Sequence, residues 1–472
     1  KYCRKRGNKK YYSFNQKNLF AKELTKLFEK TRQANDEKVF AANWMLAENI
    51  PDLDFFFDQI WLSCFVNEFA RPGGRAYKKI LGVHKGYHLW FYYDEQDSKE
   101  VGDHLVEKFL KDPSFVKKTN EQIITTSDVL RQYCEKLPET RLDKYSDRQL
   151  WQFYEKHDQL HTKYYQWGWI PVAADMFHSN LTERLKKYLR QEFSLPESKI
   201  NEYLVILTQP TKKSLIQQEH EEFLNIAIKI KKDSYHKKLF KKLFKKFKEQ
   251  EVAQFGYETH SQEYEQLFEK SVQDLKDKIR PKTYRLIQKH YEKYFYIAHM
   301  WVGQVSSFEY YLKELVRLIG SGANLETDYK KEQQDSANFT KKRQALIKKL
   351  KIRNPWLTIF DGFGDFMVTK IYRRFAQIYA IYKMEYILRE IGERLGLSLM
   401  EARFMLPQEV KQALLAGKIN RQEIRSRKKF CVYYAEKGKD LVYVYVYGYM
   451  HVYMYMYLPK YRHTLMLPHA YT

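Results

Sequence analysis

Two histidines one helical turn apart have a spacing that could support chemistry. His157 and His161 stand at positions i and i+4, so a helix would place both imidazoles on one face, where they could bind one zinc ion. The metalloprotease pattern requires glutamate directly after the first histidine, and this chain has Asp158 there. Asp175 or His178 could supply a third ligand. The pair is a candidate metal site, and surface or helix-capping histidines are the simpler alternative.

Two basic clusters have the right side chains to bind phosphate. Arg373 and Arg374 are adjacent, and Arg425 and Arg427 lead into Lys428-Lys429. Guanidinium groups can bind phosphate through two parallel hydrogen bonds. We predict that Arg373, Arg374, Arg425 and Arg427 contact phosphate. The alternative is that they are solvated residues at helix ends, where the helix dipole favours positive charge.

The glycine-rich stretches do not have the spacing of known phosphate-binding loops. Residues 71–75 and 320–322 are the two candidates. Gly320-Ser-Gly322 begins like a dinucleotide fingerprint, but it lacks the third glycine and follows a predicted helix where a strand is required. It predicts a helix–helix turn, and we predict no catalytic residue in this chain.

Residues 229–248 predict a basic amphipathic helix. Its apolar residues recur along one face, with lysines around them, as follows: Leu239, Phe240, Leu243, Phe244 and Phe247; Lys237, Lys238, Lys241, Lys242, Lys245 and Lys246. Such a helix could lie on an anionic membrane or along phosphates. The simpler interpretation is a packed helix with solvated lysines.

The composition favours a folded and strongly basic protein. The chain has 472 residues, 44% of them hydrophobic, and a net charge of +25. The size allows two or three domains, and the charge suggests nucleic acid, anionic lipid or a phosphorylated ligand as partner. Codon bias of an AT-rich genome would also enrich lysine. The four cysteines form no metal or disulfide pattern, no signal peptide is evident, and no apolar run predicts a transmembrane segment, so we expect a cytoplasmic protein.

The fold class that we predict is mostly α, with long helices, a small α+β N-terminal part and a C-terminal β-hairpin. Residues 1–125 would form the α+β part: a basic helical segment before Pro51, an apolar helix over 55–69, and a hairpin of 79–83 and 87–93. Residues 126–429 would form a helical body with helices through 283–319, 325–350 and 370–395. A capping box at Ser146-x-x-Gln149 begins one of its earlier helices.

The stretch 370–447 has a distinctive order of elements. A long amphipathic helix ends at Gly396, and Ser398-x-x-Glu401 caps a short second helix. Pro407 opens a third helix that Gly417 closes. A helical turn over 422–429 precedes a hairpin over 430–447.

This order resembles the segment before the phosphohistidine domain in relatives of phosphoenolpyruvate synthase. The matching positions are Leu395-Gly396-Leu397-Ser398, Leu406, Glu409-Val410, Leu414-Leu415, Gly417, Ile424 and Arg427. The specific part covers about a tenth of the chain. The resemblance implies a PEP-utilising phosphotransferase (kinase) family that uses ATP and Mg²⁺, with an ATP-grasp domain and a mobile phosphohistidine domain.

The chain lacks the family's catalytic motif, Gly-Gly-x-x-x-His. The sole Gly-Gly, at Gly73-Gly74, is followed by Arg-Ala-Tyr-Lys. We expect a non-catalytic scaffold or linker, a fragment with no cofactor of its own, that works with a phosphohistidine domain in cis or in trans. A basic nucleic-acid-binding protein and a membrane-surface protein are the alternatives. The alternating Tyr-rich tail, 448–472, suggests a frame that has run into a nucleotide repeat; a long edge hairpin is its alternative.

Overall fold

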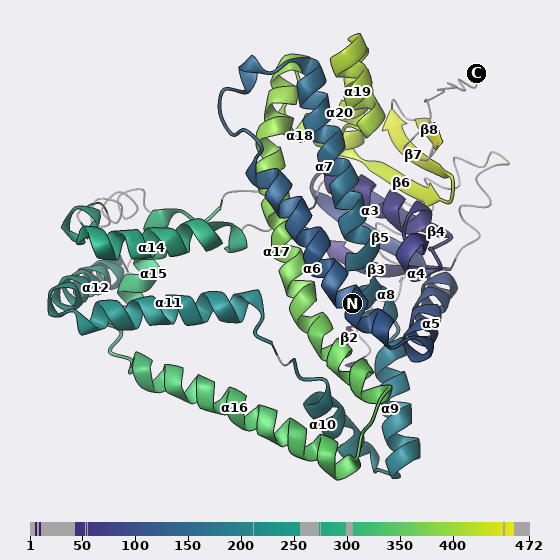
Figure 1. The fold of residues 1–472 in the computed structure, drawn as a ribbon. Helices are drawn as coiled ribbons and strands as arrows, with labels where there is room; N and C mark the ends of the chain where they lie inside the picture. The colour runs from purple at the N-terminus through teal and green to yellow at the C-terminus, as the bar shows by residue number, and fades with distance from the viewer. Residues whose placement is uncertain are drawn as a thin grey trace.

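The protein is mostly helical, as the sequence predicts (Figure 1). The computed structural model describes residues 43–51, 53, 55–210, 212–254, 273, 275–298, 305–446 and 449–456, with two short strands, β1 (Lys5–Arg6) and β2 (Lys9–Lys10). The helices before residue 210 are α3 (Phe55–Asn67), α4 (Ala70–Gly73), α5 (Glu95–Lys111), α6 (Ser114–Glu135), η1 (Leu142–Lys144), α7 (Asp147–Gly168), α8 (Ile170–Asp175), α9 (Asn180–Phe193) and α10 (Glu197–Leu207). Those after it are α11 (Leu215–Lys232), α12 (Ser234–Gln254), α14 (Pro281–Tyr294), η2 (Phe295–Ala298), α15 (Phe308–Gly320), α16 (Leu325–Leu350), α17 (Trp356–Leu395), α18 (Leu399–Ala402), α19 (Pro407–Ala416) and α20 (Arg421–Lys429).

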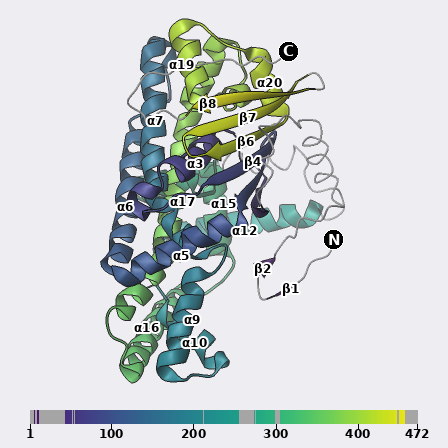
Figure 2. The same cartoon turned by 90° about the vertical axis from the view of Figure 1, so that its right-hand side faces the viewer.

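One antiparallel sheet draws its strands from both ends of the described chain. Its strands are β3 (Trp44–Ile50), β4 (Lys79–Lys85), β5 (His88–Asp94), β6 (Cys431–Glu436), β7 (Lys439–Val446) and β8 (Tyr449–Met456), in the order β3-β5-β4-β6-β7-β8. Both predicted hairpins, β4–β5 and β6–β7, are present. They join where β4 pairs with β6 (Figure 2). In this pairing Val83 lies opposite Val432. The predicted N-terminal part and the C-terminal hairpin therefore share one sheet.

The prediction of a helix up to Pro51 is wrong for residues 44–50. These residues form the edge strand β3, which pairs with β5 and has an irregularity between Leu46 and Glu48. Trp44 and Leu46 lie on the sheet face that contains Tyr92 and Tyr434, away from α3. Pairing with β5 is a long-range contact that local patterning does not report, and β-propensity depends strongly on such neighbours. The rest of that predicted helix lies outside the described residues.

The main core, which we call the body, is layered. Helix α3 packs between the sheet and α7, and α17 lies along α6 and α7 (Figure 1). Phe55 shows how the layers meet, because its ring contacts the rings of His84 on β4, Tyr433 on β6 and Phe404 beyond α18. The apolar 55–69 pattern thus becomes the central helix of the body.

A second hydrophobic core forms a separate projection, which we call the arm. It consists of α11, α12, α14, α15 and the first turn of α16. Helix α16 then runs back from the arm to α10 (Figure 1). Helix α17 contacts α11 of the arm and the short helix η2 that follows α14. The predicted helix–helix turn at 320–322 is present between α15 and α16, with Gly322 at a φ of +81°.

Helix α17 is longer than the pattern predicts. It begins at Trp356, not near residue 370. Its added first turns contain Gly362 and Gly364. A Cβ on Gly362 would lie 2.0 Å from Val116 of α6, and one on Gly364 would lie 2.9 Å from the Thr208 carbonyl oxygen. These two glycines therefore permit close packing of α17 against α6 and against the end of α10.

Candidate functional site

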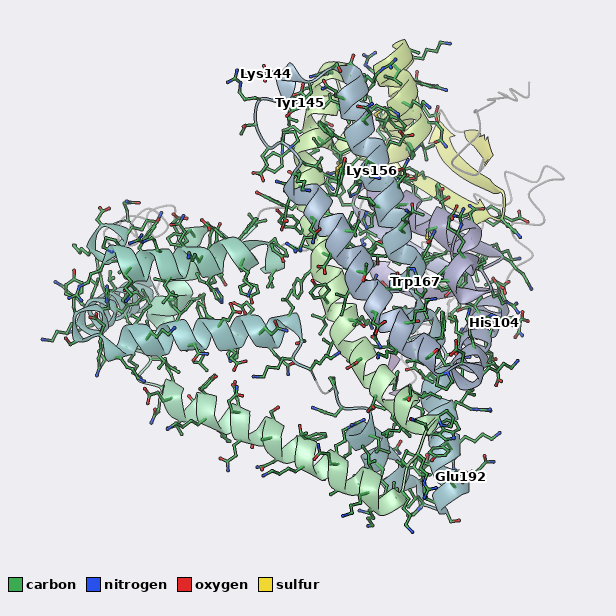
Figure 3. All side chains as sticks on the ribbon, in the orientation of Figure 1. His104, Lys144, Tyr145, Lys156, Trp167 and Glu192 are labelled. Carbon is green, nitrogen blue, oxygen red and sulfur yellow. The ribbon has the colours of Figure 1, made fainter. Side chains whose placement is uncertain are left out.

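The two candidate metal-binding histidines lie inside the body. The predicted capping box of Ser146 and Gln149 begins α7, and both histidines are completely buried on that helix. The preceding residue, Lys156, is exposed on α7 (Figure 3). His157 stacks on Phe56 with 5.6 Å between ring centroids. The pair is therefore part of the aromatic core between α3 and α7.

Burial controls the protonation of these histidines. Desolvation lowers the pKa of His157 to about 4, against a weaker opposing effect of Asp158. Desolvation, with repulsion from His157 and Arg373, lowers the pKa of His161 well below its ordinary value. Both rings are therefore neutral at pH 7, the form in which imidazole binds metal.

A third ligand does not join the pair among the described residues. No group of three or more His, Cys, Asp or Glu side chains that could hold a metal lies within that part of the chain. The Asp175 carboxylate instead accepts hydrogen bonds from the Thr182 backbone N–H at 2.7 Å and from its hydroxyl at 2.9 Å. His178 lies in the turn between α8 and α9.

The same face of α7 forms a buried polar layer with α17. The Tyr164 hydroxyl donates to the Arg373 carbonyl oxygen at 3.0 Å and lies 3.3 Å from Gln377 Oε1. Gln377 Nε2 donates to the Tyr165 hydroxyl and lies 3.5 Å from His161 Nε2. Sequence reasoning missed Tyr164, Tyr165 and Gln377. The readable signal for the two tyrosines was their three- and four-residue spacing from His161, whereas Gln377 stands four residues after Arg373 on α17 and has no such spacing from the histidines.

Arg373 joins this polar layer and is itself buried. Its Nη1 donates to the Tyr164 hydroxyl at 3.3 Å, and its guanidinium lies 5.6 Å from the Tyr164 ring centroid and 5.8 Å from that of Trp169. A Cβ on Gly168 would lie 2.4 Å from Arg373 Cδ. Glycine at 168 therefore makes room for the arginine side chain.

A cationic cluster borders the layer where α17 faces β3. It consists of Lys370, Arg373 and Arg374, and Arg374 is exposed. Burial raises the pKa of Glu48 on β3, although all three cations act to lower it. Burial also lowers the pKa of Lys370, with repulsion from Arg373 next in size. The predicted pair Arg373 and Arg374 therefore lies near Lys370 and the Glu48 carboxylate.

The second arginine pair has a different environment. Arg427 is fully buried, and its guanidinium contacts the Glu409 carboxylate at 2.6 and 2.8 Å and that of Glu423 at 2.6 Å. It also donates to the Phe404 carbonyl oxygen at 2.7 Å. Two carboxylates thus compensate its charge. We call Arg427 with these partners the Arg427 clamp, which joins α19 and α20 to the loop after α18.

Arg425 lies on the exposed side of α20. Its Nε is 3.0 Å from the Glu401 carboxylate, and about half of its side chain is exposed. Arg421 of the same helix donates to the Leu395 carbonyl oxygen at the end of α17. Arg373 lies 22 residues before Leu395, about 33 Å along the helix. The two predicted arginine pairs therefore do not form one phosphate site.

Comparison with known proteins adds no family assignment. No protein-family model matches the chain, and a search of curated proteins found no match either. In the part of the chain that the structure describes, no helix is long and apolar enough to cross a membrane.

Proposed function

We propose that this chain is the non-catalytic structural body of a phosphoenolpyruvate-synthase-like phosphotransferase. The observation that carries the proposal is the Arg427 clamp, because it is built from the segment that resembles this family. Glu409 and Arg427 both belong to the matching positions, and their side chains meet at 2.6 Å. In this proposal the matching residues are shared with the family because the Arg427 clamp fixes the end of the helical body to the sheet that contains β6.

The clamp would hold the C-terminal hairpin at a defined place. The Gly86 N–H in the β4–β5 turn donates to the Lys428 carbonyl oxygen at 3.1 Å. At the other end of β6, the Gly438 N–H donates to Asn67 Oδ1 of α3 at 2.9 Å. A phosphohistidine domain, in cis or in trans, would then dock against a rigid base.

The cationic cluster of Lys370, Arg373 and Arg374 is our proposed contact for a phosphorylated ligand. Arg374 is exposed, and the cluster gathers three positive charges at one end of the polar layer. Arg427 is the poorer candidate, because Glu409 and Glu423 already occupy its hydrogen-bond donors. We place the protein in the cytoplasm, in keeping with the buried thiols of Cys64, Cys134 and Cys431, which form no disulfide.

Phosphate incorporation tests the non-catalytic role. The purified chain is incubated with Mg²⁺ and either labelled ATP or labelled phosphoenolpyruvate, and acid-labile phosphohistidine is measured. We expect no incorporation, since phosphoryl transfer needs a phosphate cradle, metal-binding carboxylates and an acceptor. Labelling that disappears when one histidine is replaced would contradict the proposal and identify that histidine as the acceptor.

The genomic DNA tests the family assignment separately. If the resemblance reflects kinship, a shifted frame downstream of codon 441 should encode a Gly-Gly-x-x-x-His motif within the length of a domain. A stop codon with no such motif in any of the three frames would count against it.

A further inference from the structure

A lysine-rich face on the arm is the feature that the proposed function leaves unexplained. Helix α12 carries six lysines between residues 237 and 246, with no acidic residue among them: Lys237, Lys238, Lys241, Lys242, Lys245 and Lys246. All six are exposed. We call them the lysine face.

The lysine face points away from the arm because the apolar side of α12 is used in packing. Phe240 is completely buried and Leu243 is 8% exposed, both in the core of the arm. Phe244 packs on α15 so closely that a Cβ on Gly320 would lie 2.2 Å from its ring. A helix held on this side must present its lysines outward.

The spacing of the lysines suits a long anionic partner. Lys237, Lys241 and Lys245 follow one another at four-residue steps, and Lys238, Lys242 and Lys246 form a second such row. Four residues advance about 6 Å along a helix, so each row presents a charge every turn. Helix α12 packs on α11 and α15 and lies at the outer end of the arm, at the left in Figure 1. A chain-like polyanion could therefore lie along it without meeting the body.

Several arm carboxylates are occupied by other cations. Glu326 contacts Lys232 at 3.1 Å, and Glu222 contacts Lys293 at 2.7 Å. Asp233, directly before α12, contacts Arg280 at 3.0 Å. The Arg280 guanidinium also lies 4.7 Å from the ring centroid of Tyr235, which is 42% exposed at the start of the lysine face. The start of the lysine face is therefore bordered by an arginine whose charge Asp233 compensates and by an exposed aromatic ring.

We propose that the lysine face of α12 is a docking surface for the phosphate backbone of a nucleic acid. Closely spaced phosphates match a ladder of lysines, and release of condensed counterions would drive the association. The structure favours this partner over a membrane. An interfacial helix buries its apolar face in lipid, whereas that face of α12 is already buried against α15 and the rest of the arm.

Binding to labelled nucleic acid tests the proposal with the full chain. The probes are a duplex DNA of about 30 base pairs and a single-stranded RNA of similar length, titrated at several salt concentrations. Six phosphate contacts predict a slope of log K against log salt of roughly −5 for the duplex, and removing four lysines should reduce its magnitude by about 3 to 4. The variant is K237Q/K238Q/K241Q/K242Q, for which we expect at least a tenfold loss of affinity near 0.1 M salt.

A matched control separates the lysine face from net charge. K117Q/K118Q removes two exposed lysines from α6 on the body, and K238Q/K242Q removes two from the lysine face. Glutamine has a helix propensity similar to that of lysine, and thermal unfolding followed by circular dichroism checks that each variant is folded. We expect K238Q/K242Q to weaken binding several-fold and K117Q/K118Q to leave it unchanged.

Equal losses of affinity in K238Q/K242Q and K117Q/K118Q would overturn the proposal, as would full binding by the quadruple variant. So would an absence of binding by the wild-type chain at 0.1 M salt. Binding to phosphatidylcholine vesicles that contain phosphatidylserine, without binding to either nucleic acid, would assign the lysine face to a membrane surface instead. None of these results depends on the phosphotransferase proposal.

Discussion

The body and the arm place their positive charges in opposite ways. The body buries arginines against specific partners: Arg427 against Glu409 and Glu423, Arg403 against Glu385 at 3.1 Å, and Arg343 against Asp361 and the Leu207 carbonyl oxygen. The arm exposes lysines along α12, and its buried polar side chains, within the part of the chain that the structure describes, include His236 and His290 but no arginine or lysine.

This difference follows from the chemistry of the two side chains. A guanidinium is planar, weakly hydrated and rich in donors, so it can be buried if its hydrogen bonds are satisfied, whereas an ammonium is strongly hydrated. The net charge of +25 therefore includes both buried and exposed positive side chains. Buried arginines stabilise the body internally, and the charge on the lysine face of the arm is accessible to a large partner.

The largest effect that we predict is at Arg427. Arg427→Met would leave Glu409 and Glu423 without their cation, and removing one member of a buried ion pair costs about 3–5 kcal/mol. The free energy of unfolding in urea measures this. Arg425→Met is the control, because its exposed pair with Glu401 should contribute no more than about 1 kcal/mol. Equal effects of the two substitutions would show that the clamp does not stabilise the body.

An effect of similar size is expected in the core of the arm. Leu243→Asp would place a carboxylate among Phe240, Leu312 and their neighbours without a partner. We expect a loss of at least about 3 kcal/mol, because Leu→Ala alone typically costs about 2–5 kcal/mol and a buried charge adds to it. Lys241→Glu with Lys245→Glu should change stability by less than about 0.5 kcal/mol. The contrast between body and arm fails if the lysine changes destabilise the fold as much as Leu243→Asp.

The third effect depends on pH and concerns His157. Its pKa is about 4 in the folded protein and 6.5 when unperturbed. Between these values the unfolded chain binds the proton and the folded chain does not, so stability falls as pH is lowered from 6.5 to 4. The loss attributable to His157 is about 3 kcal/mol.

The variant His157→Phe keeps a ring to stack on Phe56 and removes the titration. We expect its unfolding free energy to depend less on pH by that amount, measured in urea at several pH values. His220→Gln, at an exposed position, should retain the wild-type dependence. If His157→Phe loses stability in acid as steeply as the wild type, a group other than His157 causes the pH dependence.

Local signals in the sequence predicted local structure well. The capping boxes at Ser146 and Ser398, the left-handed Gly396 and Gly417, and both hairpins form as predicted, because each depends on residues within a few positions. The pairing of β4 with β6 could not be predicted in this way, because the two strands are far apart in the sequence and no local pattern connects them. Neither could β3, whose strand conformation comes from β5.

The candidate site shows the same limit. The i, i+4 spacing of His157 and His161 predicts one shared helix face, and α7 provides it. The spacing does not say whether that face meets solvent or a second helix, and here it meets α17 through Gln377. For Arg427, Glu423 at i−4 was a readable partner, whereas Glu409 becomes one only because two helices fold together.

The join between β4 and β6 also determines when the sheet can be completed in the cell. Roughly 350 residues separate the two strands, and a ribosome that adds about 5–20 residues per second needs roughly 20–70 s to make them. During this interval the β4 edge of the N-terminal hairpin has unpaired backbone groups, and such edges can pair with another chain. The rate of translation, and any chaperone that covers this edge, should therefore affect how much of the newly made protein aggregates before β6 emerges.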